Sequence, residues 1–516
     1  MNQPVKIKHA LTTTREGDFA AWYQEVISEA EMAEESGVRG CMVIKPWGYG
    51  IWERIQQIMD ARIKEAGVSN CYFPLFIPLS YFAKEAEHVE GFAKEMAVVT
   101  HHRLVGDGKG SLVPDPEAKL EEPLIVRPTS ETVIGAAMAR WIQSWRDLPM
   151  LTNQWANVVR WEMRTRMFLR TSEFLWQEGH TAHADKADAM AETLRALEMY
   201  RAFAEDVLAM PVIAGEKPEN ERFPGAVATF SIEAMMQDGK ALQAGTSHYL
   251  GTGFAEAAGI RYQDREGQQS LCHTTSWGVS TRMIGGVIMT HGDDDGLRVP
   301  PRIAPHQIVI LPMLRDTDED AALLGYCEEL RAALAQQSAC GERVRVLLDK
   351  RPGKATQKRW AWVKKGVPLI LEIGGRDAAS GQVSAIRRDR LWQDNGKVAF
   401  AAQSRADFLA SAAAELEDIQ RALHAEATAR RDAQIVRGLD SLDALAAYFG
   451  EDAKYPGWAE VQWSKPTGAA LDDVVAKLKA LKLTIRNTPM GGALANGTCL
   501  FTGEPAVETV YVARSY

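Results

Sequence analysis

The chain has 516 residues, and this length predicts roughly two to four domains rather than a single hydrophobic core. Its contents of 46% hydrophobic and 25% charged residues are those of a globular protein. The formal net charge of −9 argues against a generally basic surface that coats nucleic acid, so any contact with RNA must use local basic patches.

The cysteine pattern and the start of the chain bear on location. Six cysteines are scattered without a Cys-x-x-Cys pair, so we expect free thiols in a reducing compartment, and neither disulfides nor a four-cysteine zinc site. The first residues lack an apolar segment of signal-peptide length, and no stretch approaches the roughly 20 apolar residues of a membrane span. We therefore expect a cytoplasmic protein without a membrane partner.

The first predicted elements are helices with one apolar face. Residues 18–35 place apolar side chains at helical spacing, and a second stripe runs from Ile51 to Ile63 and ends at a glycine C-cap at Gly67. A β-rich run over 71–77 stops at Pro78, and a further helix is expected over 84–95. By themselves these elements are ordinary parts of a core.

Residues 124–131 read Leu-Ile-Val-Arg-Pro-Thr-Ser-Glu and lead into an apolar helix expected over 133–141. Hydroxyl side chains directly before a helix satisfy its first backbone N–H groups. From the residues alone, the pattern therefore predicts that Thr129 or Ser130 caps this helix.

The stretch 158–180 predicts an antiparallel hairpin with a basic turn that contains Arg164, Arg166 and Arg170. Guanidinium groups match the geometry of phosphate oxygens and keep their charge, so three on one loop indicate a polyphosphate ligand. Phe174 offers a flat face for a purine. The alternative from charge alone is a solvated basic turn.

Beyond the hairpin we expect a helix over 186–210, then two strand-like runs joined by an Asp-Gly turn at 238–239. Gln243, Thr246 and His248 lie close together in the second run. A lone histidine in such a place is more often structural than catalytic. The residue pattern alone leaves both roles open for His248.

A polar strand is then expected to end at Ser280, and a helix to begin near Arg282. Glycine inside a helix costs roughly 1 kcal/mol, so Gly285 and Gly286 predict close packing there, for example against another backbone. The acidic triplet at 293–295 lies between glycines and before two prolines, which predicts a solvated turn rather than a metal site.

Prolines at 300–305 mark the clearest domain boundary. Strands are expected at 306–311, 343–348, 368–373 and 382–386, with helices at 318–336 and 354–365 between them. Alternation of strands and helices at this length predicts an α/β domain with a largely parallel sheet. A long alanine- and glutamate-rich helix over 403–430 leads into the last segment.

These elements together resemble a known family. Arg160-x-Glu162, a variable loop and Arg170-x-x-x-Phe174 resemble motif 2 of the class II aminoacyl-tRNA synthetases, and FLWQEGHTAHA at 174–184 resembles the prolyl-tRNA synthetases. The helix and strand ending at Pro78 resemble motif 1, and the glycine-bearing helix resembles motif 3. KGVPLILEIGGRD at 365–377 resembles the anticodon-binding domain of class IIa enzymes, and the terminal ARSY matches the family's C-terminus.

The resemblance implies a fold class and a domain plan. We expect an α+β class II catalytic domain, an antiparallel sheet with helices, at 1–300. An α/β anticodon-binding domain is expected at 301–405, and a small α/β C-terminal domain at 406–516, ending in Tyr516. In the family this tyrosine carboxylate reaches towards the catalytic domain. Motif 1 builds the dimer interface in the family, so a homodimer is expected.

The resemblance also implies a reaction and its residues. Proline would be adenylated by ATP and transferred to tRNA(Pro), with Arg160 and Arg282 as the catalytic cations. Phe174 and Arg282 would sandwich the adenine. The implied proline-binding residues are Thr129, Glu131, Arg160, Trp176, Glu178, His180 and His248. The implied ATP-binding residues are Arg160, Glu162, Arg170, Thr171, Phe174, Gln243, Thr246, Ser280 and Arg282. Glu372 and Arg387 are the implied anticodon readers, with Lys358 and Arg388 as phosphate contacts.

The resemblance also bears on metal ions, and the tail departs from the family pattern. Magnesium would arrive with ATP, held mostly by phosphates. The archaeal- and eukaryotic-like prolyl enzymes hold a zinc with four cysteines in the tail, but here only Cys499 remains and Thr502 stands at a second position, so we expect no structural zinc.

The interval between His180 and His273 leaves no room for the editing insertion of bacterial-type enzymes. We therefore expect an archaeal/eukaryotic-like type without alanyl-tRNA hydrolysis, and a separate editing protein as a partner.

Two alternatives remain from the sequence. A class II synthetase for threonine, glycine or histidine would share the nucleotide site, but the Pro-Thr-Ser-Glu and WQEGH segments disfavour it. A non-catalytic tRNA-binding paralogue could lose its nucleotide arginines freely, whereas Arg160, Arg170 and Arg282 are all present. Exchange of pyrophosphate into ATP, tested with each amino acid, separates these possibilities.

Overall fold

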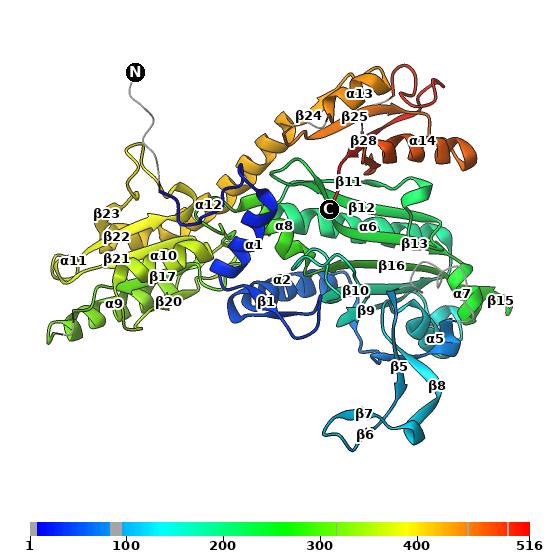
Figure 1. Cartoon of the computed structure of the whole chain (residues 1–516), viewed down its shortest axis with the longest axis horizontal. Helices are drawn as coiled ribbons and strands as arrows, with labels where there is room; N and C mark the ends of the chain where they lie inside the picture. Colours follow the sequence, from blue (N-terminus) through cyan, green and yellow to red (C-terminus); the bar gives the residue numbers. More distant parts are fainter. Residues whose placement is uncertain (1–7, 83–94, 316, 451–453, 493–494) are drawn as a thin grey trace.

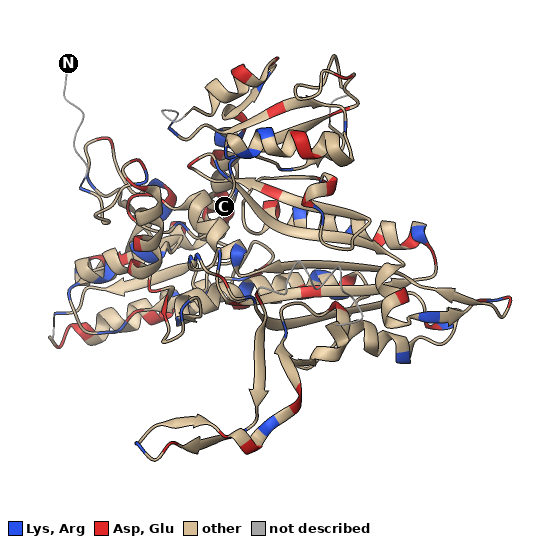
Figure 2. Ribbon diagram, turned by 45° about the vertical axis from the view of Figure 1, so that its right-hand side comes forward, with Lys and Arg blue, Asp and Glu red and all other residues tan. Residues whose placement is uncertain are grey.

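The computed structural model describes residues 8–82, 95–315, 317–450, 454–492 and 495–516. The helix expected over 84–95 lies almost wholly outside these residues. No helix within the described ranges combines the length and the apolar character that a bilayer span requires. Figure 2 shows basic and acidic residues interspersed on the same elements, in keeping with the net charge of −9.

An eight-stranded sheet forms the centre of the molecule (Figure 1), in the order β27-β11-β12-β13-β16-β10-β9-β3. Its neighbours pair antiparallel, except β3 with β9, which are parallel. The antiparallel catalytic sheet expected from the sequence is therefore confirmed. The strands are β3 (Ser69–Asn70), β9 (Met150–Val159), β10 (Glu173–His183), β11 (Val212–Glu216), β12 (Ala228–Met235), β13 (Ala241–Gly251), β16 (His273–Ser280) and β27 (Thr488–Pro489).

Helices pack on this sheet through the apolar faces that the sequence predicts. Helix α1 begins after Asp18, whose carboxylate accepts the N–H groups of Ala20 and Ala21. It ends at Glu29, short of the 18–35 range expected, and buries Phe19, Trp22, Tyr23, Val26 and Ile27. Helix α6 runs along the sheet and contacts five of its strands. The helices of this part are α1 (Phe19–Glu29), α2 (Pro46–Glu65), α3 (Leu79–Phe82), α5 (Glu131–Trp141), α6 (Lys186–Asp206), α7 (Gly253–Ala258) and α8 (Arg282–His291).

Smaller strands surround the main sheet. An arm built from β4, β5 and β8 ends in the two-stranded β6–β7 tip, which projects from the body in Figure 1. These strands are β1 (Ala33–Glu35), β2 (Met42–Ile44), β4 (Phe76–Pro78), β5 (Ala97–His101), β6 (Leu104–Gly106), β7 (Leu112–Pro114), β8 (Lys119–Val126), β14 (Arg261–Gln263) and β15 (Gln269–Leu271).

A second unit follows the proline-rich segment, with a five-stranded sheet in the order β20-β17-β21-β22-β23. The pairings of β17 with β20 and β21 are parallel, whereas β22 and β23 pair antiparallel, so the sheet is mixed rather than largely parallel. Its elements are β17 (Ile308–Pro312), α9 (Asp320–Ala335), β18 (Ser338–Ala339), β19 (Glu342–Arg343), β20 (Val346–Leu348), α10 (Ala355–Lys365), β21 (Leu369–Ile373), α11 (Gly375–Ala379), β22 (Gln382–Arg387) and β23 (Ala401–Ser404).

The long helix α12 (Arg405–Ala433) leads to a third unit with the sheet order β24-β25-β28-β26. This unit also supplies β27 to the main sheet, so its backbone continues the catalytic sheet at β11. Its remaining elements are β24 (Ile435–Arg437), α13 (Leu442–Tyr448), β25 (Trp458–Trp463), α14 (Gly468–Ala480), β26 (Thr484–Ile485) and β28 (Glu508–Ala513).

Two local predictions need correction. Gly285 and Gly286 do pack closely, but against side chains: a Cβ at Gly285 would lie 2.5 Å from Leu169 Cδ2, and one at Gly286 would lie 3.0 Å from Met210 Sδ. The acidic triplet at 293–295 forms a turn, but it is not solvated. Asp295 is buried, and Asp293 and Asp294 pair with arginines distant in sequence.

Candidate active site

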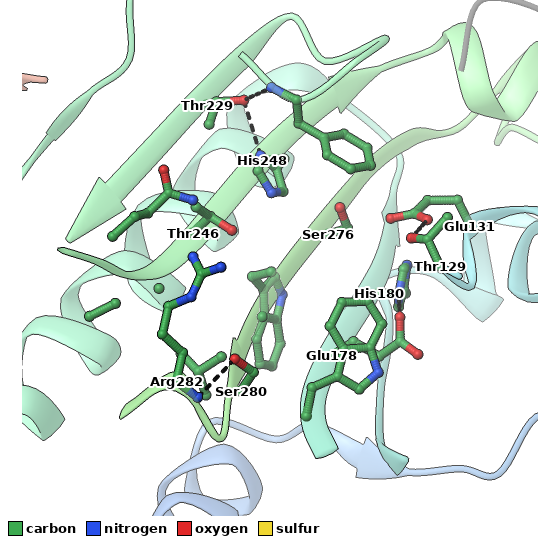
Figure 3. Close-up of a pocket in the computed structure, with 18 of the residues that line it drawn as sticks. Thr129, Glu131, Glu178, His180, Thr229, Thr246, His248, Ser276, Ser280 and Arg282 are labelled. Carbon is green, nitrogen blue, oxygen red and sulfur yellow. Dashed lines mark hydrogen bonds and ion pairs between the residues drawn. The ribbon is translucent and has the colours of Figure 1, made fainter. Parts of the chain in front are cut away.

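A cavity of about 240 Å³ opens over strands β10, β13 and β16 (Figure 3). Its lining includes every predicted proline- and ATP-binding residue except Glu162, Arg170 and Thr171. The predicted residues that line it are Thr129, Glu131, Arg160, Phe174, Trp176, Glu178, His180, Gln243, Thr246, His248, Ser280 and Arg282. The structure thus brings together residues from five separate segments of the chain.

The pleat of the strands explains this convergence. Side chains two residues apart share one face of a strand, so Trp176, Glu178 and His180 of β10 all face the cavity. The register pairs Trp176 with Ser280 and His180 with Ser276 on the adjacent strand β16. One surface of the sheet therefore forms the floor of the cavity.

A buried carboxylate organises one end of the cavity. Glu178 Oε1 accepts hydrogen bonds from Ser130 Oγ at 2.5 Å and from Gln154 Nε2 at 2.6 Å, and Oε2 lies 2.8 Å from His180 Nε2. Burial lowers the pKa of His180, but its hydrogen bond to Glu178 and the charges of Glu178 and Glu131 together raise it above its ordinary value. The predicted cap is thus absent, because the Ser130 side chain makes no capping bond and binds Glu178 instead.

Thr129, Glu131 and Arg160 form a polar group beside this carboxylate. The Thr129 hydroxyl donates to a carboxylate oxygen of Glu131. Arg160 donates through Nε to the Pro128 carbonyl at 2.9 Å, and its guanidinium lies 5.7 Å from the ring centre of Phe174 and 5.5 Å from that of Trp176. Burial lowers the pKa of Arg160, while the carboxylates of Glu131, Glu95 and Glu178 oppose this shift.

His248 lies on the opposite wall as a neutral imidazole. Its Nδ1 is 3.0 Å from Thr229 Oγ1, which also accepts the backbone N–H of Phe223 at 3.0 Å. The Phe223 ring packs on the imidazole with a centre-to-centre distance of 4.7 Å. Burial lowers the pKa of His248 to about 4, helped by the charge of His180 and opposed by Glu131.

Arg282 is the first residue of α8 and points into the cavity (Figure 3). Its Nε donates to the Leu169 carbonyl at 3.1 Å, and its backbone N–H donates to Ser280 Oγ at 3.2 Å. Burial and the nearby charges of Arg170 and Arg160 lower the pKa of Arg282 to about 10, which leaves the side chain charged at neutral pH.

The remaining predicted nucleotide residues lie on the loop between β9 and β10. Glu162 and Arg170 form an ion pair of 3.7 Å, and Arg170 is half exposed. Thr171 is buried. These three residues lie next to the cavity along the chain but outside its lining.

The sequence alone missed several lining residues, among them Glu221, Arg222, Phe223, Thr229 and Ser276. Ser276 is buried, and within the described ranges its hydroxyl has no hydrogen-bond partner. Period-two alternation back from Ser280 could have identified Ser276. Phe223 and its neighbours come from a loop before β12, where no local pattern indicates the approach to the cavity.

The predicted anticodon contacts all have partners within the chain. Glu372 pairs with Arg359 at 3.0 Å, and burial raises the pKa of Glu372 although Arg359 opposes this. Arg387 pairs with Asp389 at 2.9 Å and with Asp418 at 2.8 Å.

The two candidate phosphate contacts in this unit are buried. Lys358 donates to the carbonyls of Asp349 and Arg351 at 3.1 and 2.9 Å. Arg388 faces Asp293 instead of the open surface that a phosphate contact requires.

Within the described ranges, no group of three or more His, Cys, Asp or Glu side chains is placed to hold a metal ion. Cys499 is buried, and Ser464 and Thr502 lie beside it, with their hydroxyl oxygens 3.0 Å apart. Burial raises the pKa of the Cys499 thiol, but hydrogen bonds from Ser464 and Thr502 bring it below its ordinary value.

Comparisons with known proteins agree with this geometry. Residues 115–291 match the tRNA synthetase class II core domain (G, H, P, S and T), and residues 307–403 match an anticodon binding domain. The chain is 79% identical to the proline--tRNA ligase of Novosphingobium aromaticivorans over 516 residues, 100% of both chains. It is 58% identical to that of Paramagnetospirillum magneticum over 511 residues, 99% of both chains.

A solved structure shows the same likeness. The prolyl-tRNA synthetase of Cryptosporidium parvum, complexed with L-proline and AMP, matches with a TM-score of 0.86 at 33% identity, over 98% of this chain and 97% of that one. The same enzyme complexed with halofuginone and AMPPNP matches equally well, at 34% identity.

Proposed function

Because the chain belongs to the class II proline–tRNA ligases, we propose that the cavity between Glu131 and Arg282 is where it joins proline to ATP. The enzyme activates L-proline as prolyl-adenylate and then transfers it to tRNA. The observation that supports this site is the convergence of a buried acid, two partly buried guanidinium groups and aromatic rings on one cavity.

Proline would bind at the end of the cavity that holds Thr129 and Glu131. Its secondary ammonium has two N–H donors and a positive charge, which the Glu131 carboxylate and the Thr129 hydroxyl can accept. The Trp176 ring and the neutral His248 would border the pyrrolidine ring. Arg160 would then hold the proline carboxylate and the α-phosphate.

ATP would occupy the part of the cavity near Arg282. Phe174 and Arg282 bind the adenine in this proposal, with Gln243, Thr246 and Ser280 beside it. Glu162, Arg170 and Thr171 would act from the adjoining loop. A carboxylate oxygen of proline attacks the α-phosphorus, the bond from that phosphorus to the bridging oxygen breaks, and pyrophosphate leaves.

No side chain needs to act as a nucleophile, since catalysis consists of positioning and of stabilising the charge on the phosphates. Magnesium would accompany ATP as part of the substrate, held mainly by phosphate oxygens.

In the second step a terminal ribose hydroxyl of tRNA(Pro) attacks the prolyl carbonyl, and AMP leaves. We infer that residues 1–300 form the catalytic domain, residues 301–405 the anticodon-binding domain and residues 406–516 the C-terminal domain, with Glu372 and Arg387 as anticodon readers.

A homodimer is the proposed assembly. Exposed apolar side chains concentrate on the arm and on the segment that follows α2, including Tyr72 at 76% and Leu112 at 70% exposure. Such a surface favours association, and two copies can bury the same patch on each. Light scattering should give twice the chain mass, and serine at Tyr72 and Leu112 should shift the protein to the monomer.

We also propose a cellular location and an editing arrangement for this enzyme. The six cysteines are all unpaired, which supports a reducing, cytoplasmic location. The short interval between β10 and β16 supports a subtype without an editing insertion, and thus a separate editing protein as partner.

Pyrophosphate exchange tests the proposed site. Proline should support exchange, whereas threonine, glycine and histidine should not. Glu131→Gln should raise the KM for proline, because the amide removes the negative charge that pairs with the ammonium. Glu173→Gln makes the same change at the start of strand β10, outside the lining, and is the matched control. An unchanged KM for proline in Glu131→Gln would remove this carboxylate from the proposed site.

A further inference from the structure

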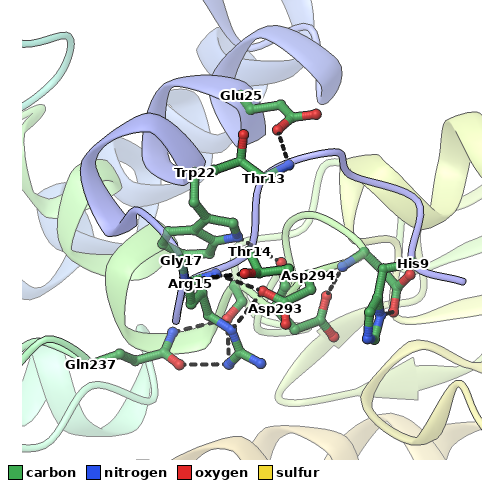
Figure 4. Close-up of polar contacts among 12 residues, drawn as sticks. His9, Thr13, Thr14, Arg15, Gly17, Trp22, Glu25, Gln237, Asp293 and Asp294 are labelled. Carbon is green, nitrogen blue, oxygen red and sulfur yellow. Dashed lines mark hydrogen bonds and ion pairs between the residues drawn. The ribbon is translucent and has the colours of Figure 1, made fainter. Parts of the chain in front are cut away.

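The acidic triplet, residues 293–295, directly follows helix α8 and anchors the N-terminal segment (Figure 4). Asp294 accepts hydrogen bonds from the backbone N–H and the Nε of Arg15, at 2.9 and 3.2 Å. The Asp293 carbonyl accepts the indole N–H of Trp22 at 2.9 Å. Asp295 accepts the backbone N–H of Ala10 at 2.8 Å. The turn therefore holds both the segment before α1 and the first turn of α1 itself.

The triplet also holds the anticodon-binding unit. Both terminal nitrogens of Arg388 donate to the two carboxylate oxygens of Asp293, at 2.7 and 2.5 Å. Arg388 also donates through Nε to the Val363 carbonyl at 2.8 Å and is buried. Asp295 accepts the indole N–H of Trp392 at 2.6 Å. A bidentate pair of this kind fixes both the distance and the orientation of the groups that carry it.

The positions of these two residues give the pair a functional meaning. Helix α8 begins at Arg282, in the lining of the cavity, and ends at His291, two residues before Asp293. Arg388 directly follows strand β22, whose last residue, Arg387, is a proposed anticodon reader. The ion pair between Asp293 and Arg388 therefore connects the end of the active-site helix to the strand end of the anticodon-binding unit.

We propose that Asp293 and Arg388 are positioning residues, which hold the anticodon-binding unit in the orientation that tRNA requires. A tRNA must reach both the anticodon-binding unit and the cavity, so its use depends on how the two are oriented. Adenylate formation involves only the cavity and does not depend on that orientation. The inference rests on the proline–tRNA ligase reaction, and not on the individual residue roles proposed above.

The test compares the two half-reactions in Asp293→Asn and Arg388→Gln. Proline-dependent pyrophosphate exchange without tRNA should stay within about twofold of the wild type, while kcat/KM for tRNA should fall about 3- to 30-fold. Asp294→Asn is the matched control, because it makes the same change in the same turn at a residue that pairs with Arg15 and not with Arg388. This control should leave both reactions within about twofold of the wild type.

The double variant tests whether the two residues act as one unit. If they do, Asp293→Asn with Arg388→Gln loses no more kcat/KM for tRNA than the worse single variant. Equal losses in exchange and aminoacylation would overturn the inference in favour of a general structural role, and additive losses or an equal effect of Asp294→Asn would also contradict it. Pyrophosphate exchange tests the residue roles proposed for the cavity. The ratio of aminoacylation to exchange tests the role of Asp293 and Arg388, so either proposal can fail without the other.

Discussion

Nε2 of His180 lies 2.8 Å from Oε2 of Glu178, and both side chains are buried in the cavity lining. The second oxygen of the same carboxylate accepts bonds from Ser130 and Gln154, so Glu178 is held from three directions. Such a buried network fixes its members in one arrangement because each polar group has a partner. The end of the cavity proposed for proline is therefore built before the substrate arrives.

Replacing Glu178 by Gln should lower the pKa of His180, because the negative charge and the acceptor that raise it are lost. A raised folded pKa stabilises the fold below the unfolded value of 6.5, and this contribution disappears as pH rises through the folded pKa. As pH rises above 6.5, the free energy of unfolding should therefore fall less in the variant than in the wild type. NMR titration of labelled histidines measures the shift, and an unmoved His180 signal would contradict the pairing.

His248 should behave in the opposite way. Its pKa is about 4 in the folded chain, so the unfolded chain binds the proton first as pH falls from 6.5. Stability then declines towards acid, by about 2 kcal/mol between pH 7 and pH 5 for this group. Denaturant unfolding of the wild type and of His248→Asn at both pH values isolates this contribution. Equal pH dependence in the two proteins would show that His248 is not held neutral.

The last residue should support the nucleotide loop. The Tyr516 hydroxyl donates to Asp238 Oδ2 at 2.6 Å, and its ring lies 5.6 Å from the guanidinium of Arg166, on the loop between β9 and β10. Deleting Tyr516 should raise the KM for ATP in pyrophosphate exchange more than Tyr516→Phe, which retains the ring and loses about 1 kcal/mol of hydrogen bonding. Tyr511→Phe, within the C-terminal sheet, is the control. An unchanged KM after deletion would separate the tail from the site.

The tail should be stable without zinc. Cys499 has hydroxyl neighbours at Ser464 and Thr502, and a single thiol cannot hold a structural zinc. Treatment with EDTA should therefore leave the melting temperature unchanged, and elemental analysis should find zinc well below one per chain. A drop in melting temperature that zinc reverses would show that the tail binds the metal through other residues.

The enzyme should not hydrolyse alanyl-tRNA(Pro). Strands β10 and β16 are joined by helices α6 and α7, by β11, β12 and β13 of the central sheet, and by the small β14–β15 pair. Fit alone discriminates against a smaller side chain by only about 1–3 kcal/mol. Exchange should therefore proceed with alanine at high concentration, while preformed alanyl-tRNA(Pro) should decay at its uncatalysed rate. Rapid deacylation by the purified enzyme would contradict this expectation.

The sequence by itself determined the local elements and most of the candidate site. Alternation of apolar and polar residues, turn residues and helix periodicity are local in the chain. They predict the hairpin at β9 and β10, the end of β16 at Ser280 and the start of α8 at Arg282. Most of the predicted substrate residues then line one cavity, because alternate residues of adjacent strands share a face.

Only the tertiary structure decided the roles that depend on distant partners. Asp293 and Arg388 are separated by 95 residues, so nothing local distinguishes this ion pair, in which Arg388 is buried, from a solvated turn. Two further contacts also join residues that are distant in the chain: Gly285 packs against Leu169, and Phe223 packs on His248. In each case burial and pairing arise from long-range contacts, whereas sequence patterns report the conformation of neighbouring residues.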